Sequence, residues 1–339
     1  MDSDQEIHDI KELGVFLEAN IPEFRSLRSA RKFGTGQSNP TYHLKAGSGE
    51  YVLRAKPPGA LLKSAHQVDR EYRVMAALKD SDVPVPEMVF LSDEDTPLGR
   101  MFFVMRFLEG RIFWDPTLPD LHAEERRQVY DAMNRTLAAL HEVDVNGVGL
   151  GDFGKPGNYF ARQTDRWIRQ YRASVVAPNR DMDRLIDWLL AEMPDDETAT
   201  LVHGDYRLDN MIFAPDDLDV IAVLDWELST LGHPLADLAY QCMQWRLPYG
   251  SGMRGLGGVD RVELGIPMEE EYIASYCKRR NIPNIRNWNF YLAFSFFRLA
   301  AILQGVVRRA MDGNASNPAR AREMAKAIPV LASMANELF

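Results

Sequence analysis

The chain has 339 residues, 46% of them hydrophobic, so it is long enough for two domains and apolar enough for a sizeable core. Its 39 basic and 49 acidic residues give a net charge of −10, which argues against general binding to the nucleic-acid phosphate backbone and suits a cationic partner. The two cysteines, Cys242 and Cys277, are too few and too far apart to indicate a disulfide framework or a zinc site.

The sequence predicts a cytoplasmic location and no membrane span. Its acidic beginning, residues 1–4, is unlike a secretory signal. The most hydrophobic late stretch is interrupted by Arg298, which argues against a membrane-spanning helix. The oligomeric state stays open.

A glycine-containing loop is the first segment that could bind a ligand. It lies between two possible strands, 31–33 and 41–45, and consists of Gly34, Thr35, Gly36, Gln37 and Ser38. Glycine lets backbone amides approach phosphate oxygens closely, although two glycines one residue apart also mark ordinary hairpin turns. No Gly-x-x-x-x-Gly-Lys-Ser/Thr motif occurs, so a P-loop NTPase is disfavoured.

The next segments pair a basic strand with an acidic helix. Arg54 ends the possible strand 51–54, and Lys56 follows two residues later, so both would share one face of a strand. The stretch 65–78 has apolar residues at helical spacing and contains Glu71. Glu71 is a candidate ion-pair partner for the cation, and the alternative is a solvated charge. Residues 101–110 then read as a buried strand that runs into a linker.

Two long helices are predicted after this strand, at 124–141 and 288–309. Within the second, Arg298 lies among apolar residues, so it is paired inside, faces a ligand or turns to solvent. If Arg298 contacts a ligand, its positive charge would favour an anionic acceptor. Three aromatic residues are further acceptor-site candidates, with the core as the alternative: Tyr159, Trp167 and Trp245.

The most informative segment is a loop with the spacing of a kinase catalytic loop. His203 and Asp205 are separated by one residue, and Asn210 follows Asp205 after four. An aspartate beside an acceptor hydroxyl can orient it and accept its proton, so Asp205 is the predicted base. Two short strands, 211–213 and 219–224, form a predicted hairpin that brings Asp225 close to Asn210. Carboxylate and amide oxygens suit Mg²⁺, so these two residues are the predicted metal ligands.

These motifs resemble the aminoglycoside phosphotransferase and choline kinase superfamily over nearly the whole chain. The segments 51–59, 64–73 and 151–159 are most similar to kinase-like domains related to those fused to acyl-CoA dehydrogenases. The resemblance implies a two-lobed α+β protein-kinase-like fold. A small antiparallel-sheet lobe, 1–108, would bind the nucleotide, and a larger helical lobe, 109–339, would hold the catalytic loop and the acceptor.

The resemblance also implies ATP, Mg²⁺ and roles for individual residues. Arg54 occupies the position of the family lysine that contacts phosphate, with Lys56 as the alternative, and Glu71 would pair with this cation. The backbone of Arg106 to Leu108 would contact adenine. His203 and Asp237 would support the catalytic loop, with Asp237 hydrogen-bonded to it, while Glu227 would contact Mg²⁺ or the nearby backbone. Asp152-Phe153-Gly154 spells a kinase metal motif, but it precedes the catalytic loop and is read as a turn.

The leading hypothesis is a Mg-ATP-dependent phosphotransferase that acts on a small-molecule hydroxyl, through Asp205, Arg54 and Glu71. A protein kinase is less favoured, because no activation loop ending in Ala-Pro-Glu follows Asp225. The alternative is a nucleotide-binding pseudokinase, motivated by arginine at the lysine position. Aminoglycoside, aminoalcohol, sugar and hydroxyacyl-CoA acceptors stay open, the last because the dehydrogenase-fused relatives are implicated in phosphorylating such compounds. ATP is expected over GTP by resemblance.

Overall fold

The computed structural model describes residues 7, 9–34, 39–58, 67–195, 198–313 and 318–339. The chain divides into two compact units. The first comprises Met1–Phe113, Asn146–Leu150 and Leu208–Ser229, and the second comprises Trp114–Val145, Gly151–Arg207 and Thr230–Phe339. The predicted lobe boundary after residue 108 stays a prediction.

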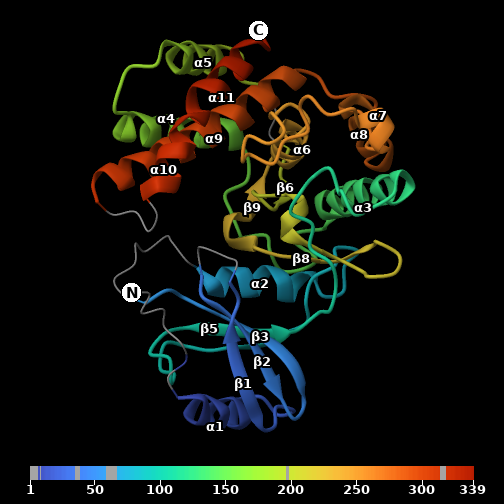
Figure 1. Ribbon diagram of the computed structural model, residues 1–339, viewed down its shortest axis with the longest axis vertical. Helices are drawn as coiled ribbons and strands as arrows, with labels where there is room; N and C mark the ends of the chain where they lie inside the picture. Colours follow the sequence, from blue (N-terminus) through green and yellow to red (C-terminus); the bar gives the residue numbers. More distant parts are fainter. Residues whose placement is uncertain (1–6, 8, 35–38, 59–66, 196–197, 314–317) are drawn as a thin grey trace. The chain divides into compact units, whose positions relative to one another are not determined.

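The first unit is built on a five-stranded antiparallel sheet with the order β1-β2-β3-β5-β4 (Figure 1). The strands are β1 Leu27–Lys32, β2 Thr41–Ala46, β3 Gly49–Ala55, β4 Met88–Leu91 and β5 Phe102–Arg106. Helix α1, Ile10–Asn20, begins where the Asp9 side chain accepts hydrogen bonds from two backbone amides, and it covers one face of the sheet. Helix α2, Val68–Leu78, contacts β4 and β5.

The side chains of β3 alternate between the two faces of the sheet, and one set packs in the core beside α1. Tyr51, Leu53 and Ala55 are fully buried in the cluster that includes residues of α1. Because successive side chains of a strand point to opposite faces, Arg54 projects from the other face.

The first unit also contains the metal-loop hairpin predicted from the sequence. Strands β7, Met211–Phe213, and β8, Val220–Val223, pair antiparallel. The 3₁₀ turns η1, Leu208–Asn210, and η2, Trp226–Leu228, flank them. The hairpin prediction is confirmed.

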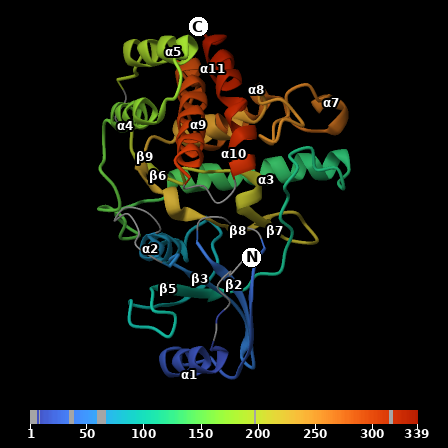
Figure 2. The ribbon, with the colours of Figure 1, turned by 60° about the vertical axis from the view of Figure 1, so that its left-hand side comes forward.

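The second unit is mainly helical around the long helix α9, Trp288–Met311 (Figure 2). Two short strands, β6 Thr200–Val202 and β9 Thr230–Gly232, pair antiparallel in it. The other helices are α3 Ala123–Glu142, α4 Tyr159–Ser174, α5 Arg180–Ala191, α6 Leu235–Met243, α7 Arg261–Leu264, α8 Glu269–Arg279, α10 Pro318–Ala325 and α11 Ala327–Asn336. Both predicted long helices are thus present, and the predicted α+β class is confirmed.

Helix α9 packs against α4, α5, α6, α10 and α11. Among the described residues it is the one helix long and apolar enough to cross a membrane, with a mean hydropathy of 1.7 in its most apolar window. However, 72% of that window is buried inside the protein, as in the core helix of a helical domain.

Candidate functional site

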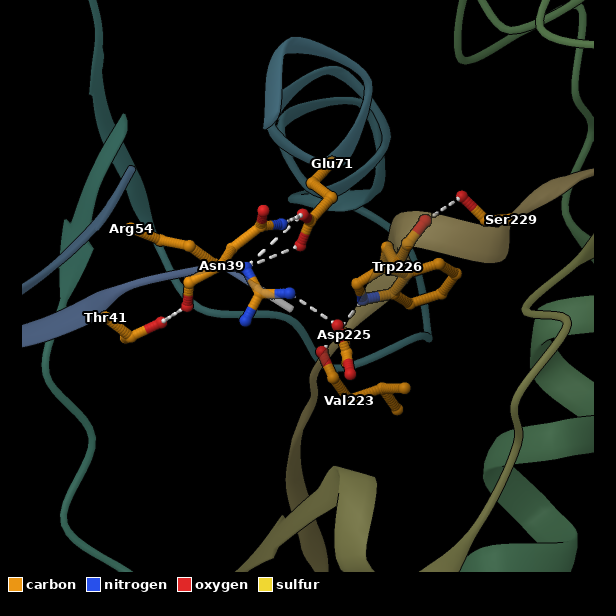
Figure 3. A network of polar contacts seen from close by, with 8 residues as sticks. All are labelled: Asn39, Thr41, Arg54, Glu71, Val223, Asp225, Trp226 and Ser229. Carbon is orange, nitrogen blue, oxygen red and sulfur yellow. Dashed lines mark hydrogen bonds and ion pairs between the residues drawn. The ribbon is translucent and has the colours of Figure 1, made fainter. Parts of the chain in front are cut away.

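In the first unit, Arg54 joins two carboxylates (Figure 3). Its Nε lies 3.0 Å from Oε2 of Glu71, and its Nη2 lies 2.5 Å from Oδ1 of Asp225. Lys56 lies instead 3.3 Å from the exposed Glu94. Of the two cations that the sequence left open, Arg54 is therefore the one beside the predicted metal carboxylate.

Glu71 is buried, with 1% of its surface exposed, so it is not the solvated charge that was the alternative. Besides Arg54, it accepts a 2.9 Å hydrogen bond from Nδ2 of Asn39, and the carbonyl of Asn39 accepts one from Thr41. Asn39 was not predicted as a site residue. Its position directly after the glycine loop was the one available signal, because nothing in the sequence indicates that its amide reaches α2.

The buried Glu71 predicts a pH-dependent stability. Burial raises its pKa to about 7, against the opposing charge of Arg54, with Asp225 and Glu227 adding to the rise. An acid whose pKa is raised on folding stabilises the folded state fully below its unfolded pKa of 4.5, and this contribution is lost as the pH rises through about 7. The loss amounts to about 3 kcal/mol.

We therefore expect the free energy of unfolding to decline between pH 5 and pH 8 more steeply in the wild type than in Glu71→Gln. Urea titrations at four pH values would measure both slopes. Equal slopes would show that Glu71 does not titrate in this range.

Asp225 is held at the start of η2 by a compact turn. Its backbone is left-handed, with φ 64° and ψ 57°. The following Trp226 donates from Nε1 to the carbonyl of Val223 at 2.9 Å, and its own carbonyl accepts from the Ser229 hydroxyl at 2.6 Å (Figure 3). These bonds fix the turn that presents Asp225.

Asn210 and Asp225 fit the requirements of Mg²⁺. Asn210 ends η1, and its carbonyl accepts a 2.8 Å hydrogen bond from the amide of Leu224, the residue before Asp225. Magnesium takes oxygen ligands and commonly one or two carboxylates, with phosphate and water completing its shell. No cluster of three or more His, Cys, Asp or Glu metal ligands occurs among the residues that the structure describes.

The residues predicted to contact the nucleotide lie in the glycine loop and at the end of β5. Gly34 has open space where a Cβ would lie, whereas Thr35, Gly36, Gln37 and Ser38 lie outside the described residues. Arg106 ends β5, and its backbone amide donates to the carbonyl of Glu87 at 2.9 Å. The amide of Phe107 likewise donates to the carbonyl of Glu50 at 3.1 Å. Both N–H groups are therefore already used within the protein, and the adenine contact at Leu108 stays a prediction.

In the second unit, the loop that carries the predicted base Asp205 is held by a buried aspartate. The backbone amides of His203 and Gly204 donate to the Asp237 carboxylate at 2.6 and 2.8 Å. Burial acts to raise the pKa of Asp237. Its hydrogen bond to His141, the charges of His141 and His203 and the hydrogen bond from the His203 backbone amide oppose this effect, and the pKa is lowered overall. Asp237 is thus hydrogen-bonded to the loop, as the sequence predicts, and Nδ1 of the buried His203 accepts from the amide of Asp205 at 3.2 Å.

Asp205 contacts two residues that line a pocket of about 520 Å³ in the second unit. Nε of Arg207 lies 3.3 Å from its Oδ1. The buried Tyr240 hydrogen-bonds to Asp205, and burial followed by the charge of Asp205 raises the pKa of Tyr240, so this hydroxyl keeps its proton. Neither residue was predicted as part of the site. Tyr240 lies three residues after the predicted Asp237, but the direction of its side chain is set by the packing of α6.

Arg298 points into the protein. It is 7% exposed, and its Nη2 donates to the carbonyl of Gly204 at 2.7 Å. Of the three readings that the sequence left open, this is pairing inside the protein, so the argument for an anionic acceptor that rested on a ligand contact loses its support. Three aromatic acceptor candidates are buried in the core, outside the lining of this pocket: Tyr159, Trp167 and Trp245.

Known proteins resemble this chain in sequence. A model of the phosphotransferase enzyme family matches residues 29–272. Mouse acyl-CoA dehydrogenase family member 10 is 47% identical over 305 residues, which cover 90% of this chain and 28% of that protein. Rat acyl-CoA dehydrogenase family member 11 is 44% identical over 315 residues, 91% of this chain and 40% of that protein. The chain therefore spans less than half the length of these relatives.

Solved structures resemble it in fold. A protein from Ralstonia eutropha JMP134, proposed to be an aminoglycoside phosphotransferase, is 45% identical, with a TM-score of 0.89 over 97% of this chain and 98% of that one. A spectinomycin phosphotransferase in complex with ADP and spectinomycin is 13% identical, with a TM-score of 0.65 over 97% and 98% of the two chains. The resemblance inferred from the motifs is confirmed: the chain belongs to the phosphotransferase enzyme family and has the kinase-like fold of the aminoglycoside phosphotransferases.

Proposed function

We propose that the chain is a Mg-ATP-dependent phosphotransferase that transfers the γ-phosphate to the hydroxyl of a small molecule. The observation that carries the proposal is the contact of Arg54 with both Glu71 and Asp225. A cation fixed by a helix carboxylate beside a metal-binding aspartate is the arrangement that phosphoryl transfer requires.

The chemistry follows from the chain's own residues. The acceptor oxygen attacks the γ-phosphorus, the bond to the bridging oxygen breaks, and ADP leaves with that electron pair. The acceptor proton passes to the carboxylate of Asp205, while Arg54 orients the phosphates. Asn210 and Asp225 would hold Mg²⁺, which would neutralise phosphate charge when bound.

For the acceptor we propose an anionic hydroxy compound with an apolar part, such as a hydroxy acid or a hydroxyacyl-CoA. Three cationic residues line the pocket beside Asp205: Arg207, Arg254 and Lys326. Glu323, the one acid in its described lining, is paired with Lys326 at 2.9 Å. Apolar residues complete the wall, among them Met243, Met253, Met324, Leu299 and Leu303. With Asp205 counted, three cations face two acids at this pocket, a small excess of positive charge that suits an anionic acceptor better than a polycationic aminoglycoside. The names of the mouse and rat relatives point the same way, because acyl-CoA dehydrogenases act on acyl thioesters.

The test is ADP release from Mg-ATP with a panel of acceptors: kanamycin, choline, 4-hydroxybutyrate and 4-hydroxybutyryl-CoA. We expect turnover of the anionic acceptors and a rise in their KM of about tenfold in Arg254→Gln, as for the loss of one charge-assisted hydrogen bond. Turnover of kanamycin or choline alone would overturn the proposed acceptor class. Binding of Mg-ATP with no turnover on any acceptor would favour the pseudokinase, which the arginine at position 54 otherwise motivates.

A further inference from the structure

Arg298 and Tyr240 contact each other in the second unit, and each is bonded to the loop that carries Asp205. Arg298 lies in the middle of the apolar α9, where a charge is costly unless its donors are used. Its guanidinium carbon lies 5.4 Å from the ring centre of Tyr240 and 5.7 Å from that of Trp167. The cation is therefore held by aromatic faces and directed at one acceptor, the carbonyl of Gly204.

Gly204 is fixed at both of its backbone groups. Its amide donates to Asp237 at 2.8 Å, and its carbonyl accepts from Arg298 at 2.7 Å. Its φ of +84° is open to glycine and strained for other residues. Because Gly204 directly precedes Asp205, these two bonds set the direction in which the chain enters the catalytic residue.

Tyr240 fixes the carboxylate itself. It comes from α6, it is buried, and its hydroxyl is hydrogen-bonded to Asp205. The face of the same ring lies against Arg298. Tyr240 thus contacts both Arg298, which holds the loop, and the Asp205 carboxylate, which the loop carries.

We propose that Arg298 and Tyr240 are positioning residues for Asp205: Arg298 holds the peptide before it through Gly204, and Tyr240 holds its carboxylate through a hydrogen bond. The inference rests on the proposed function, since Asp205 is its catalytic base. Neither side chain needs to touch ATP or the acceptor for this role. Loss of either would misdirect the base without weakening the nucleotide site.

The test compares Tyr240→Phe, Arg298→Met and Arg298→Lys with the wild type. Tyr130→Phe is the matched control, because Tyr130 is also buried and its hydroxyl donates to the carbonyl of Pro116, away from the loop. We expect kcat to fall about tenfold in Tyr240→Phe and about a hundredfold in Arg298→Met, as for lost hydrogen bonds that involve a charged group. Arg298→Lys should recover part of the loss, because a lysine keeps one donor for the carbonyl. The KM for ATP and the Kd for AMP-PNP should stay within about twofold of the wild type.

A kcat for Tyr240→Phe equal to that of Tyr130→Phe would overturn the role of Tyr240. A fall in kcat for Arg298→Met that is matched by weaker AMP-PNP binding and a lower Tm would indicate general destabilisation and would overturn the role of Arg298. If the wild type turns over no acceptor, the proposed function fails. The positioning role of Arg298 and Tyr240 is then tested without kinetics, by crystal structures of the wild type and the variants with AMP-PNP. A displaced Asp205 carboxylate in Tyr240→Phe and Arg298→Met, but not in Tyr130→Phe, would support it; an unmoved carboxylate would overturn it.

Discussion

Replacing Asp205 by asparagine is expected to reduce kcat by about 10²–10⁴-fold, the contribution of a positioned general base. Asparagine has nearly the same shape and can still bond to Tyr240, but its neutral amide cannot take up the acceptor proton. The backbone amide of residue 205 would still donate to His203, so the loop should keep its conformation. Affinity for AMP-PNP should therefore stay close to that of the wild type.

Steady-state kinetics with the acceptor that turns over best, together with calorimetric titration of AMP-PNP, would measure both quantities. Asp217→Asn is the matched control, because Asp217 lies in the exposed turn of the β7–β8 hairpin and accepts a hydrogen bond from the amide of Asp219. A kcat for Asp205→Asn within about threefold of that of the control would exclude Asp205 as the base, since even a modest general base contributes more than this.

Patterns that are local in the sequence predicted the framework of the protein well. The β7–β8 hairpin has apolar strands on either side of turn-forming residues, so neighbouring residues decide this element. The pairing of Glu71 with Arg54 was one of two readings open from the sequence, and the resemblance to the kinase-like family was what favoured it.

What the sequence could not predict depends on contacts between distant segments. For Arg298, the sequence left three interpretations open. Periodicity places it on α9, but it does not show that Arg298 donates to the carbonyl of Gly204, 94 residues earlier in the chain. Asn39 and Glu71 are 32 residues apart, and their hydrogen bond depends on the packing of Asn39 against α2. The pocket beside Asp205 has the same origin, since its lining comes from α6, α9, α10 and α11 and from the segments around them. Such positions are set by tertiary packing, which no local pattern encodes.

Replacing Asp225 by asparagine is expected to lower kcat by about 10²–10³-fold and to raise the Mg²⁺ concentration for half-maximal activity, because the metal loses its charged ligand. Asparagine tolerates the left-handed backbone that Asp225 adopts, so the η2 turn should survive the substitution. The hydrogen bonds of Trp226 and Ser229 do not involve the Asp225 side chain, which is a second reason to expect an intact fold.

Initial rates across a Mg²⁺ titration would test this, with Glu227→Gln as the matched control two residues further along the chain. If Glu227 acts through backbone contacts alone, its variant keeps the wild-type Mg²⁺ dependence; a parallel shift in both variants would make Glu227 a second metal contact. Wild-type Mg²⁺ dependence in Asp225→Asn would remove Asp225 from the metal site. Its 2.5 Å contact with Arg54 would then be a structural ion pair, and the Mg²⁺ requirement would have to be met by other residues.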